Sequence, residues 1–300
     1  MQLSDFTYSD IPVQPVYDRF LKDNGVRLSI LRLDLVHPLI SGNKWFKLKF
    51  NLQQALESGK KTILSFGGAW SNHLHALAHA GVLFGFNTIG IVRGELDGTL
   101  TPCLQDAERA GMTLQGIPRQ RYAHKEDKSL LADLEQEHGD FFLVPEGGAN
   151  RAGAAGCSEI NTLYSHDDFD YICVACGTGT TLTGLLQTAT SPVLGFQVLK
   201  GSGYLENEVR RQLAEYGFEA RTSWSVNDQF HFGGYARSNC QLMKFIQDFK
   251  VCTGIELEPV YSGKMVYGIY ELIKKRDFFP QNCSILLIHG GGLQGLRGYL

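Results

Sequence analysis

The stretch YICVACGTGTTLTGLL, residues 171–186, runs from an apolar segment through a glycine-rich turn into a segment with helical spacing. The apolar segment, 171–176, shows no alternation of polar and apolar residues. We interpret it as a strand buried on both faces, which is typical of a parallel sheet. A strand, a short turn and a helix in immediate succession form the repeating unit of α/β proteins. This stretch therefore predicts an α/β fold.

Five further apolar runs extend this prediction over most of the chain. They occur at 62–66, 88–92, 141–144, 193–199 and 284–289, and segments with helical spacing lie between them at 71–85, 128–139 and 181–190. This alternation predicts doubly wound, mainly parallel sheets. An extended segment at 26–38 is expected to form an antiparallel or edge region. Six or more strands in 300 residues suggest two α/β lobes that share a ligand-binding cleft.

The overall composition excludes several classes of protein. A net charge of −3 gives no reason to expect a nucleic-acid partner. The first twenty residues lack a basic start followed by an apolar run, so no signal peptide is expected. No segment is long and apolar enough to predict a membrane span. The seven scattered cysteines predict free thiols in a reducing cytoplasm, and the C-x-x-C pair Cys173 and Cys176 is interpreted as core packing rather than a redox site.

The glycine turn in the first stretch has the features of a phosphate cup. Glycines at 177 and 179 let backbone N–H groups turn inward, and a helix N-terminus follows. Hydroxyl groups come from Thr178, Thr180 and Thr181. The sixth position of a dinucleotide fingerprint would be glycine, but it is Leu182 here, and the Gly-Lys-Ser/Thr of a P-loop is absent. A tight turn without a ligand is the alternative.

A second strand, turn and helix occur in SFGGAWSNHLHALA, which begins at Ser65. Ser71 is a candidate N-cap, and Ser71, Asn72 and the free N–H groups there could bind a carboxylate. Capping alone explains Ser71 equally well. His75 and His79 share a helix face at the spacing of zinc ligands, but the glutamate of H-E-x-x-H is missing, so no metal site is predicted.

The segment SGNKWFKLKF, from Ser41, raises a question about Lys44, which follows a Gly-Asn turn and precedes two aromatic residues. Either Trp45 and Phe46 form the buried face of a helix with outward lysines, or Lys44 is held in a dry pocket for chemistry. Two more glycine clusters, EGGAN from Glu146 and HGGG from His289, follow predicted strands. HGGG is similar to the oxyanion loop of some esterases, but their G-x-S-x-G nucleophile motif is absent.

Taken in order, the motifs SGNKWFKLKF, WSNH, EGGAN, CGTGTTLTG, EPVYSGK and HGGG make the sequence resemble one enzyme family. It is the D-cysteine desulfhydrase and 1-aminocyclopropane-1-carboxylate (ACC) deaminase family of pyridoxal-phosphate (PLP) enzymes, which has the tryptophan-synthase-β fold. The resemblance runs from about Lys44 to the C-terminus. It implies a large domain of residues 1–49 plus 162–300, a small inserted domain of residues 50–161, PLP in the cleft between them, and a cytoplasmic homodimer.

The resemblance also implies roles for individual residues. Lys44 would form the Schiff base with the cofactor and carry the substrate's α-proton, and the neighbouring aromatic residues would help to lower its pKa by desolvation. Lys47 and Lys49 are interpreted as exposed or supporting residues. Asn72 would hydrogen-bond the phenolic oxygen of PLP, and Ser262 would face the pyridine nitrogen. Ser71 would bind the substrate carboxylate, with Trp70 and His73 beside it, and Tyr261 and Tyr235 would line the substrate pocket. The phosphate would be held by Gly177, Thr178, Gly179, Thr180 and Thr181.

Departures from the family pattern bear on the substrate. Trp45 and Phe46 replace threonine and arginine, Trp70 replaces glutamine, and Gly290 replaces threonine. These changes suggest a bulkier or differently shaped substrate pocket. Ser262 stands where the deaminase has glutamate and desulfhydrases have threonine, and a hydroxyl cannot keep the pyridine nitrogen protonated. A weaker electron sink suits elimination of a β-leaving group better than opening of a cyclopropane ring.

The main hypothesis is therefore a PLP-dependent lyase that converts a small D-cysteine-like amino acid to a 2-oxo acid and ammonia. ACC deaminase is the alternative within the family, and a racemase or an enzyme for a larger amino acid stays open. A PLP-binding protein without turnover is the alternative from another class. An NAD-linked oxidoreductase is disfavoured by Leu182.

Overall fold

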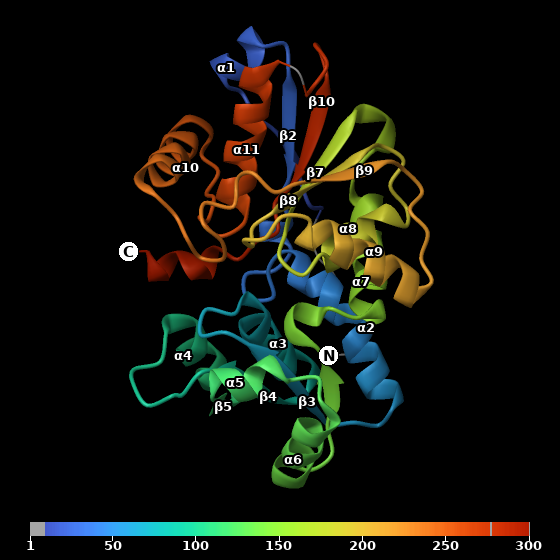
Figure 1. The fold of residues 1–300 in the computed structure, drawn as a ribbon, viewed down its shortest axis with the longest axis vertical. Helices are drawn as coiled ribbons and strands as arrows, with labels where there is room; N and C mark the ends of the chain where they lie inside the picture. Colours follow the sequence, from blue (N-terminus) through green and yellow to red (C-terminus); the bar gives the residue numbers. More distant parts are fainter. Residues whose placement is uncertain (1–9, 277, 300) are drawn as a thin grey trace.

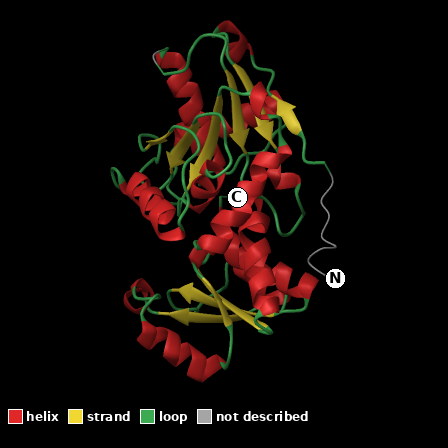
Figure 2. Cartoon of the chain, turned by 90° about the vertical axis from the view of Figure 1, so that its right-hand side faces the viewer, coloured by secondary structure: helices red, strands yellow, loops and turns green. Residues whose placement is uncertain are grey.

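The computed structural model describes residues 10–276 and 278–299 and contains two separate sheets (Figure 1). The larger has the strand order β1-β2-β10-β7-β8-β9, and the smaller has the order β5-β4-β3-β6. All neighbouring strands are parallel except β1 and β2, which are antiparallel. Figure 2 shows the sheets at opposite ends of the molecule, with helices between them. The prediction of an α/β fold with two mainly parallel sheets is confirmed.

The predicted strands and helices form close to the expected positions, because continuous apolar runs bury both faces of a central strand. The strands are β1 (Val13–Pro15), β2 (Arg27–Leu31), β3 (Thr62–Gly67), β4 (Asn87–Arg93), β5 (Thr113–Ile117), β6 (Phe142–Val144), β7 (Tyr171–Cys176), β8 (Val193–Gln197), β9 (Trp224–Asn227) and β10 (Ser284–Ile288). The antiparallel edge expected at 26–38 is confirmed by the pairing of β2 with β1.

The helices cover both sheets and fill the space between them. The α-helices are α1 (Arg19–Asp23), α2 (Asn43–Glu57), α3 (Asn72–Phe84), α4 (Pro102–Arg109), α5 (Arg119–Ala123), α6 (Lys128–His138), α7 (Arg151–Ser158), α8 (Thr180–Leu186), α9 (Tyr204–Tyr216), α10 (Cys240–Thr253) and α11 (Ser262–Lys275). Short 3₁₀ helices are η2 (Leu33–Leu35), η3 (Glu146–Gly148), η4 (Glu159–Leu163), η5 (His166–Asp168) and η6 (Leu293–Gly298). No helix in the described part of the chain is long and apolar enough to cross a membrane.

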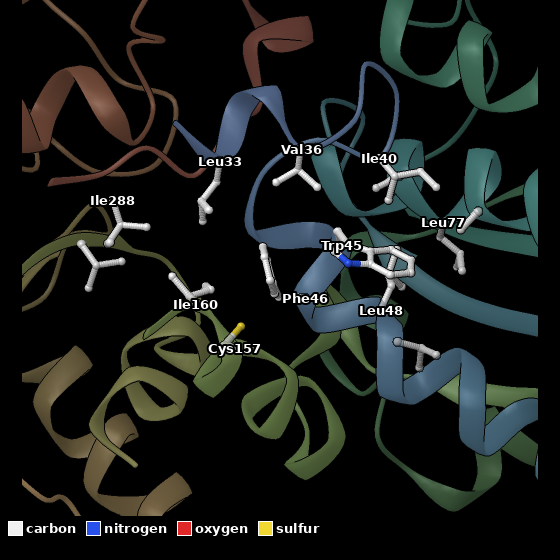
Figure 3. Packing of buried hydrophobic residues seen from close by; sticks show 14 of the residues in the cluster. Leu33, Val36, Ile40, Trp45, Phe46, Leu48, Leu77, Cys157, Ile160 and Ile288 are labelled. Atoms are coloured by element: carbon white, nitrogen blue, oxygen red, sulfur yellow. The ribbon is translucent and has the colours of Figure 1, made fainter. Parts of the chain in front are cut away.

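Helix α2 connects the two halves through a shared core. Trp45 and Phe46 are 1% and 0% exposed and pack among aliphatic side chains of α2 and its neighbours (Figure 3). The indole of Trp45 stacks on Phe84, with ring centroids 5.9 Å apart. The suggestion that these two aromatic residues reshape the substrate pocket is therefore wrong. In the segment SGNKWFKLKF, Trp45 and Phe46 form the buried face of the helix, as the first of the two alternatives proposed.

The sheets suggest where the chain divides. All four strands of the smaller sheet lie between Thr62 and Val144, whereas the strands of the larger sheet come from both sides of that segment. We propose a small domain of residues 50–161 inserted into a large domain of residues 1–49 plus 162–300. Helix α2 crosses the first boundary, and α7 packs against both α2 and α8, so the two domains are joined by a continuous helical layer.

Candidate active site

Loops that follow the carboxyl ends of strands in the larger sheet contact loops that follow strands of the smaller sheet. In parallel α/β sheets this edge is the usual position of ligand sites. The turn after β6 contacts the turn after β7, since a Cβ added to Gly147 would lie 3.3 Å from Thr178 Cγ2. The loop after β10 contacts the start of α3, where Gln294 Nε2 donates to Asn72 Oδ1 at 3.0 Å. The structure thus brings together EGGAN, CGTGTTLTG, WSNH and HGGG, which lie far apart in the sequence.

The turn before Lys44 is clamped by the HGGG loop. Gly42 has φ +70°, and a Cβ added there would lie 1.9 Å from the carbonyl oxygen of Gly290. The same oxygen accepts a hydrogen bond from the backbone N–H of Asn43 at 3.3 Å. Only glycine fits this backbone conformation and this close approach. The turn therefore fixes the position at which α2 begins and with it the Lys44 side chain.

The Lys44 amine lies at the start of α2, beside the side chain of Asn43. Its Nζ donates to Asn43 Oδ1 at 2.8 Å. Burial of the amine, followed by repulsion from the nearby Lys47, lowers the pKa of Lys44 to about 7. Near neutral pH a large fraction of the amine is therefore unprotonated, as a lysine nucleophile or base requires.

The second feature is the group of hydroxyls after β7. Thr178 and Thr180 hydroxyls lie 3.0 Å apart, and Asn43 Nδ2 donates to Thr181 Oγ1 at 2.9 Å. The Lys47 Nζ lies 3.4 Å from Thr178 Oγ1, and the side chain is only 5% exposed. The interpretation of Lys47 as exposed is therefore wrong. Lys47 lies about one helical turn after Lys44, and this position brings its amine to the cup. By contrast, Lys49 pairs with Glu159 at 2.6 Å.

We predict that Lys47→Met weakens PLP binding by about 10- to 100-fold, because it would remove a hydrogen bond from the Lys47 amine to the phosphate. The band that indicates covalent attachment should still form at saturating cofactor, because Lys44 is intact. Titration of the cofactor-free protein followed by visible absorbance measures both. Lys49→Met is the matched control and should bind PLP like the wild type. Equal affinity in the Lys47 and Lys49 variants would contradict a phosphate site at Lys47.

The start of α3 presents polar groups to the same place. Ser71 is the N-cap, and its Oγ accepts from the Leu74 N–H at 3.2 Å, which confirms the predicted cap. Its own hydroxyl proton stays available for a ligand carboxylate. The Asn72 amide is held by Gln294, and its Nδ2 lies against Gly292, where an added Cβ would be 2.4 Å away. Gln294 was not expected from the sequence, because nothing local links it to Asn72.

Trp70 and two histidines of α3, His73 and His75, have different environments. Trp70 packs against Gly298, whose added Cβ would lie 2.9 Å from the indole. His73 is buried, and its Nε2 lies 2.9 Å from Ser65 Oγ. Burial, with the nearby Lys44 and Lys47, lowers the pKa of His73 to about 3, so the ring is neutral. His75 lies near Asp106, and the described residues contain no cluster of three metal-type side chains.

At the start of α11, the Ser262 hydroxyl lies beside the Glu258 carboxylate, which already accepts hydrogen bonds from backbone N–H groups. Glu258 is 2% exposed, and its carboxylate accepts from the N–H groups of Val260 at 2.7 Å and Tyr261 at 2.9 Å, and from that of Ser262. Ser262 Oγ lies 3.0 Å from Glu258 Oε1. The carboxylate thus serves as the cap of α11, and the Ser262 hydroxyl is held against it. Glu258 is the first residue of the EPVYSGK motif, and its capping role was not expected from the sequence.

Two tyrosines close the site from the side of the larger sheet. Tyr261 lies over the cup, since a Cβ added to Gly177 would be 3.4 Å from its hydroxyl oxygen. The rings of Tyr261 and Tyr235 meet edge to face, with centroids 6.0 Å apart. Burial raises the pKa of Tyr261 well above its ordinary value, so its hydroxyl keeps its proton at neutral pH.

Other predicted features are structural. Cys173 and Cys176 are buried, and burial raises the pKa of Cys176 to about 12, which confirms core packing rather than a redox pair. Both are free thiols, as are the other five cysteines. Two surface hollows of about 360 Å³ each lie elsewhere, and neither contains a residue of the predicted site.

The residues at this site fit PLP on chemical grounds. A phosphate needs hydrogen-bond donors and positive charge, and the cup offers hydroxyls, turn amides and the Lys47 amine. An aldehyde needs a neutral amine, and Lys44 provides one. The start of α11 adds the Ser262 hydroxyl. Lys44, Lys47, the cup and Ser262 all belong to the proposed large domain, and Asn72 on α3 belongs to the small one.

Comparison of the sequence and of the fold with those of known proteins identifies relatives of this chain. A mitochondrial bifunctional D-cysteine desulfhydrase/ACC deaminase of Arabidopsis thaliana is 31% identical over 91% of this chain and 74% of its own length. The chain belongs to the D-cysteine desulfhydrase/ACC deaminase family. A Thermotoga maritima protein provisionally named as an ACC deaminase is 29% identical over 96% of both chains. The crystal structure of an ACC deaminase homologue superposes with a TM-score of 0.83 over 99% of this chain and 95% of its own, at 26% identity.

No general family profile matches the chain, so membership rests on these pairwise relationships. The family consists of PLP-dependent enzymes, and this chain is an enzyme of that family.

Proposed function

We propose that the chain is a PLP-dependent deaminating lyase that acts on a small amino acid with a β-leaving group, such as D-cysteine. With the consumption of one water molecule, the products would be a 2-oxo acid, ammonia and the protonated leaving group. The observation that carries the proposal is the start of α11, where the side chain at the predicted pyridine-facing position is the Ser262 hydroxyl. The carboxylate beside it, Glu258, accepts hydrogen bonds from backbone N–H groups and from Ser262 itself. A neutral hydroxyl there supports elimination rather than ring opening.

Different residues of this chain would have different roles in the reaction. PLP, when bound, withdraws electrons from the substrate α-carbon and makes its proton removable. The Lys44 amine, with its pKa near 7, would accept that proton. Tyr261 keeps its proton because its pKa is raised, so it would donate to the departing group rather than act as a base.

The remaining side chains would hold the cofactor and the substrate. Ser71 would donate its hydroxyl proton to the substrate carboxylate, with Trp70 and His73 beside it. Asn72, oriented by Gln294, would donate to the phenolic oxygen of PLP. The phosphate would be held by Lys47 and by Gly177, Thr178, Gly179, Thr180 and Thr181. Ser262 would lie at the pyridine nitrogen, and Tyr235 would line the substrate pocket beside Tyr261.

The free cysteines and the family resemblance support a cellular location and an oligomeric state for the proposed enzyme. We place it in the cytoplasm, which agrees with seven cysteines that are all free thiols. Family resemblance supports a homodimer. The family resemblance also supports a small amino acid as the substrate.

ACC deamination is the second candidate, and it is favoured by the names of the relatives. The Arabidopsis relative carries both activities in its name, and the Thermotoga relative carries the deaminase name. The two activities release different 2-oxo acids, so a single assay separates them.

We predict that the PLP-loaded protein releases pyruvate and sulfide from D-cysteine faster than it releases 2-oxobutanoate from ACC. The measurement is 2-oxo acid formation from D-cysteine, L-cysteine and ACC under the same conditions. Faster 2-oxobutanoate release would overturn the interpretation of Ser262. Cofactor binding without a spectral change on addition of any amino acid would instead identify a PLP-binding protein without turnover.

A further inference from the structure

Lys264 is a buried lysine of the EPVYSGK motif, and the proposed reaction assigns no role to it. It lies on α11, two residues after Ser262, and is only 1% exposed. Burial lowers the pKa of its amine to about 8, and the nearby Glu258 carboxylate acts in the opposite direction. Lysine is rarely buried completely unless its amine has hydrogen-bond partners. The partners of this amine therefore indicate what the lysine does.

The amine of Lys264 binds two consecutive turns of the segment that precedes α10. Its Nζ donates to the carbonyl oxygen of His231 at 2.9 Å and to that of Gly234 at 2.7 Å. Each carbonyl also closes a turn, since that of His231 accepts from the Gly234 N–H at 3.0 Å and that of Gly234 accepts from the Arg237 N–H at 3.2 Å. Tyr235 directly follows Gly234, so the lysine holds the turn that carries this tyrosine.

Both turns contain a non-glycine residue in the left-handed region of backbone conformation. Phe232 has φ +51° in the first turn, and Ala236 has φ +54° in the second. Residues with a Cβ adopt this conformation unfavourably, and it persists where surrounding contacts hold it. Lys264 supplies such contacts to both turns, and the Tyr299 hydroxyl donates to the Ala236 carbonyl at 3.2 Å. Removal of the Lys264 amine is therefore expected to let the two turns relax.

Helix α11 also holds this segment through aromatic packing. Phe230 and Phe232 both meet the ring of Tyr267 edge to face, with centroids 6.1 and 5.1 Å apart. Tyr267 lies three residues after Lys264, and residues at this spacing share one face of a helix. The same helix begins at Ser262, which the proposed function places at the pyridine nitrogen. One helix thus carries the proposed cofactor contact and holds the two turns.

We propose that Lys264 is a positioning residue for Tyr235 in the substrate pocket. The inference rests on the proposed function, which places Tyr235 beside Tyr261. The Tyr235 ring meets the Tyr261 ring with centroids 6.0 Å apart, but Tyr235 is 40% exposed. A ring exposed to this extent is not fixed by core packing, so its position depends on the backbone that carries it. Lys264 acts through that backbone and would not contact the substrate.

The opposing interpretation is that Lys264 only stabilises the fold. The two interpretations differ in what happens when the Tyr235 ring is absent. A lysine that acts through Tyr235 has little left to contribute to turnover once the ring is removed, whereas a general contribution to the fold persists. The two single variants and the double variant therefore separate the interpretations.

The experiment compares Lys264→Met, Tyr235→Ala and the double variant, each loaded with PLP. Lys264→Met is expected to lower kcat/KM for D-cysteine by about 10-fold or more, because a small displacement of a pocket residue is sufficient for such a loss. In the Tyr235→Ala background, the same substitution should change kcat/KM by less than about 2-fold. Lys264→Arg keeps the charge and the donors and should retain part of the activity. Lys275→Met is the control and should behave like the wild type, because this exposed lysine of α11 contacts Gln229 outside the two turns.

Hydrogen–deuterium exchange gives a second measurement that needs neither turnover nor cofactor. In Lys264→Met, the amides of Gly234 and Arg237 should exchange about 10-fold faster or more, because both donate to carbonyls that Lys264 also binds. Amides of β7, between β10 and β8 in the larger sheet, should change much less.

Three results would overturn the inference. The first is wild-type kcat/KM in Lys264→Met, or the same loss with and without the Tyr235 ring. The second is unchanged exchange at Gly234 and Arg237. The third is failure of Lys264→Met to fold, because a lysine that acts only on these turns is not required by either sheet. A wild type that takes up PLP but does not turn over D-cysteine would instead reject the proposed function, and the exchange rates would still show whether Lys264 holds the turns.

Discussion

Lys44→Ala is expected to abolish the visible absorbance of covalently held PLP and to lower turnover by at least about 10³-fold. The reason is that Lys44 would supply both the attachment point and the base, and no other neutral amine occupies its position. The variant should fold normally and keep its Tm, because alanine removes a desolvated amine and favours a helix. Absorbance after dialysis, turnover and thermal unfolding together check this prediction.

Lys49→Ala is the control for the loss of a lysine from the same helix. Lys49 pairs with Glu159 away from the cup, so its loss should leave absorbance and turnover near wild-type values. If Lys44→Ala retained turnover, or if it lost activity only by unfolding, the assignment of Lys44 would fail.

Gly42→Ala is expected to destabilise the protein by about 3 kcal/mol or more, which corresponds to a fall in Tm of roughly 5–10 °C. Two effects add. Alanine is strained at φ +70°, and its Cβ would overlap the carbonyl oxygen of Gly290 at 1.9 Å. Relief of this overlap must separate the SGN turn from the HGGG loop and displace Lys44. Turnover at a temperature where the variant is folded should therefore fall as well.

Gly59→Ala separates the two effects. Gly59 has φ +69°, nearly the same as Gly42, but no atom lies within 4 Å of its added Cβ. This control carries only the backbone strain, about 1 kcal/mol or slightly more. Denaturant unfolding of both variants measures the difference. Equal destabilisation by the two substitutions would show that the close contact between Gly42 and Gly290 does not hold the turn.

The fold was largely predictable because its central strands are unambiguous in the sequence. The run at 171–176 is apolar throughout and became β7, which lies between β10 and β8 in the larger sheet. Strands β1, β5 and β9 were missed, and all three are edge strands whose residues are mostly half-buried. Their sequences, VQP, TLQGI and WSVN, mix polar and apolar residues, so hydrophobicity does not separate them from loops.

The site was predictable where function depends on local sequence. The Ser71 cap and the glycine turn after β7 depend on neighbouring residues and could be found from them. The burial of Lys47 could not, because it depends on contact with Thr178, 131 positions away. Lysine is also the residue type least expected inside a protein. Gln294 was missed for the same reason, since its partner Asn72 is 222 positions away.

The aromatic residues beside Lys44 show a different kind of error. Trp45, Leu48 and Leu52 recur at spacings of three and four residues, which is the pattern of one buried helix face. That periodicity was sufficient to place Trp45 in the core. The pocket interpretation came from a comparison of residue identities with the family and ignored the periodicity.

The most direct test of the account is to locate the cofactor on the chain. The PLP-loaded protein is reduced with borohydride, digested and analysed by mass spectrometry. We expect the added cofactor mass on the peptide that contains Lys44, with fragment ions assigning it to Lys44 rather than to Lys47. Modification of Lys47 or of a lysine outside the site, or no modification at all, would contradict the claim that this site holds PLP through Lys44.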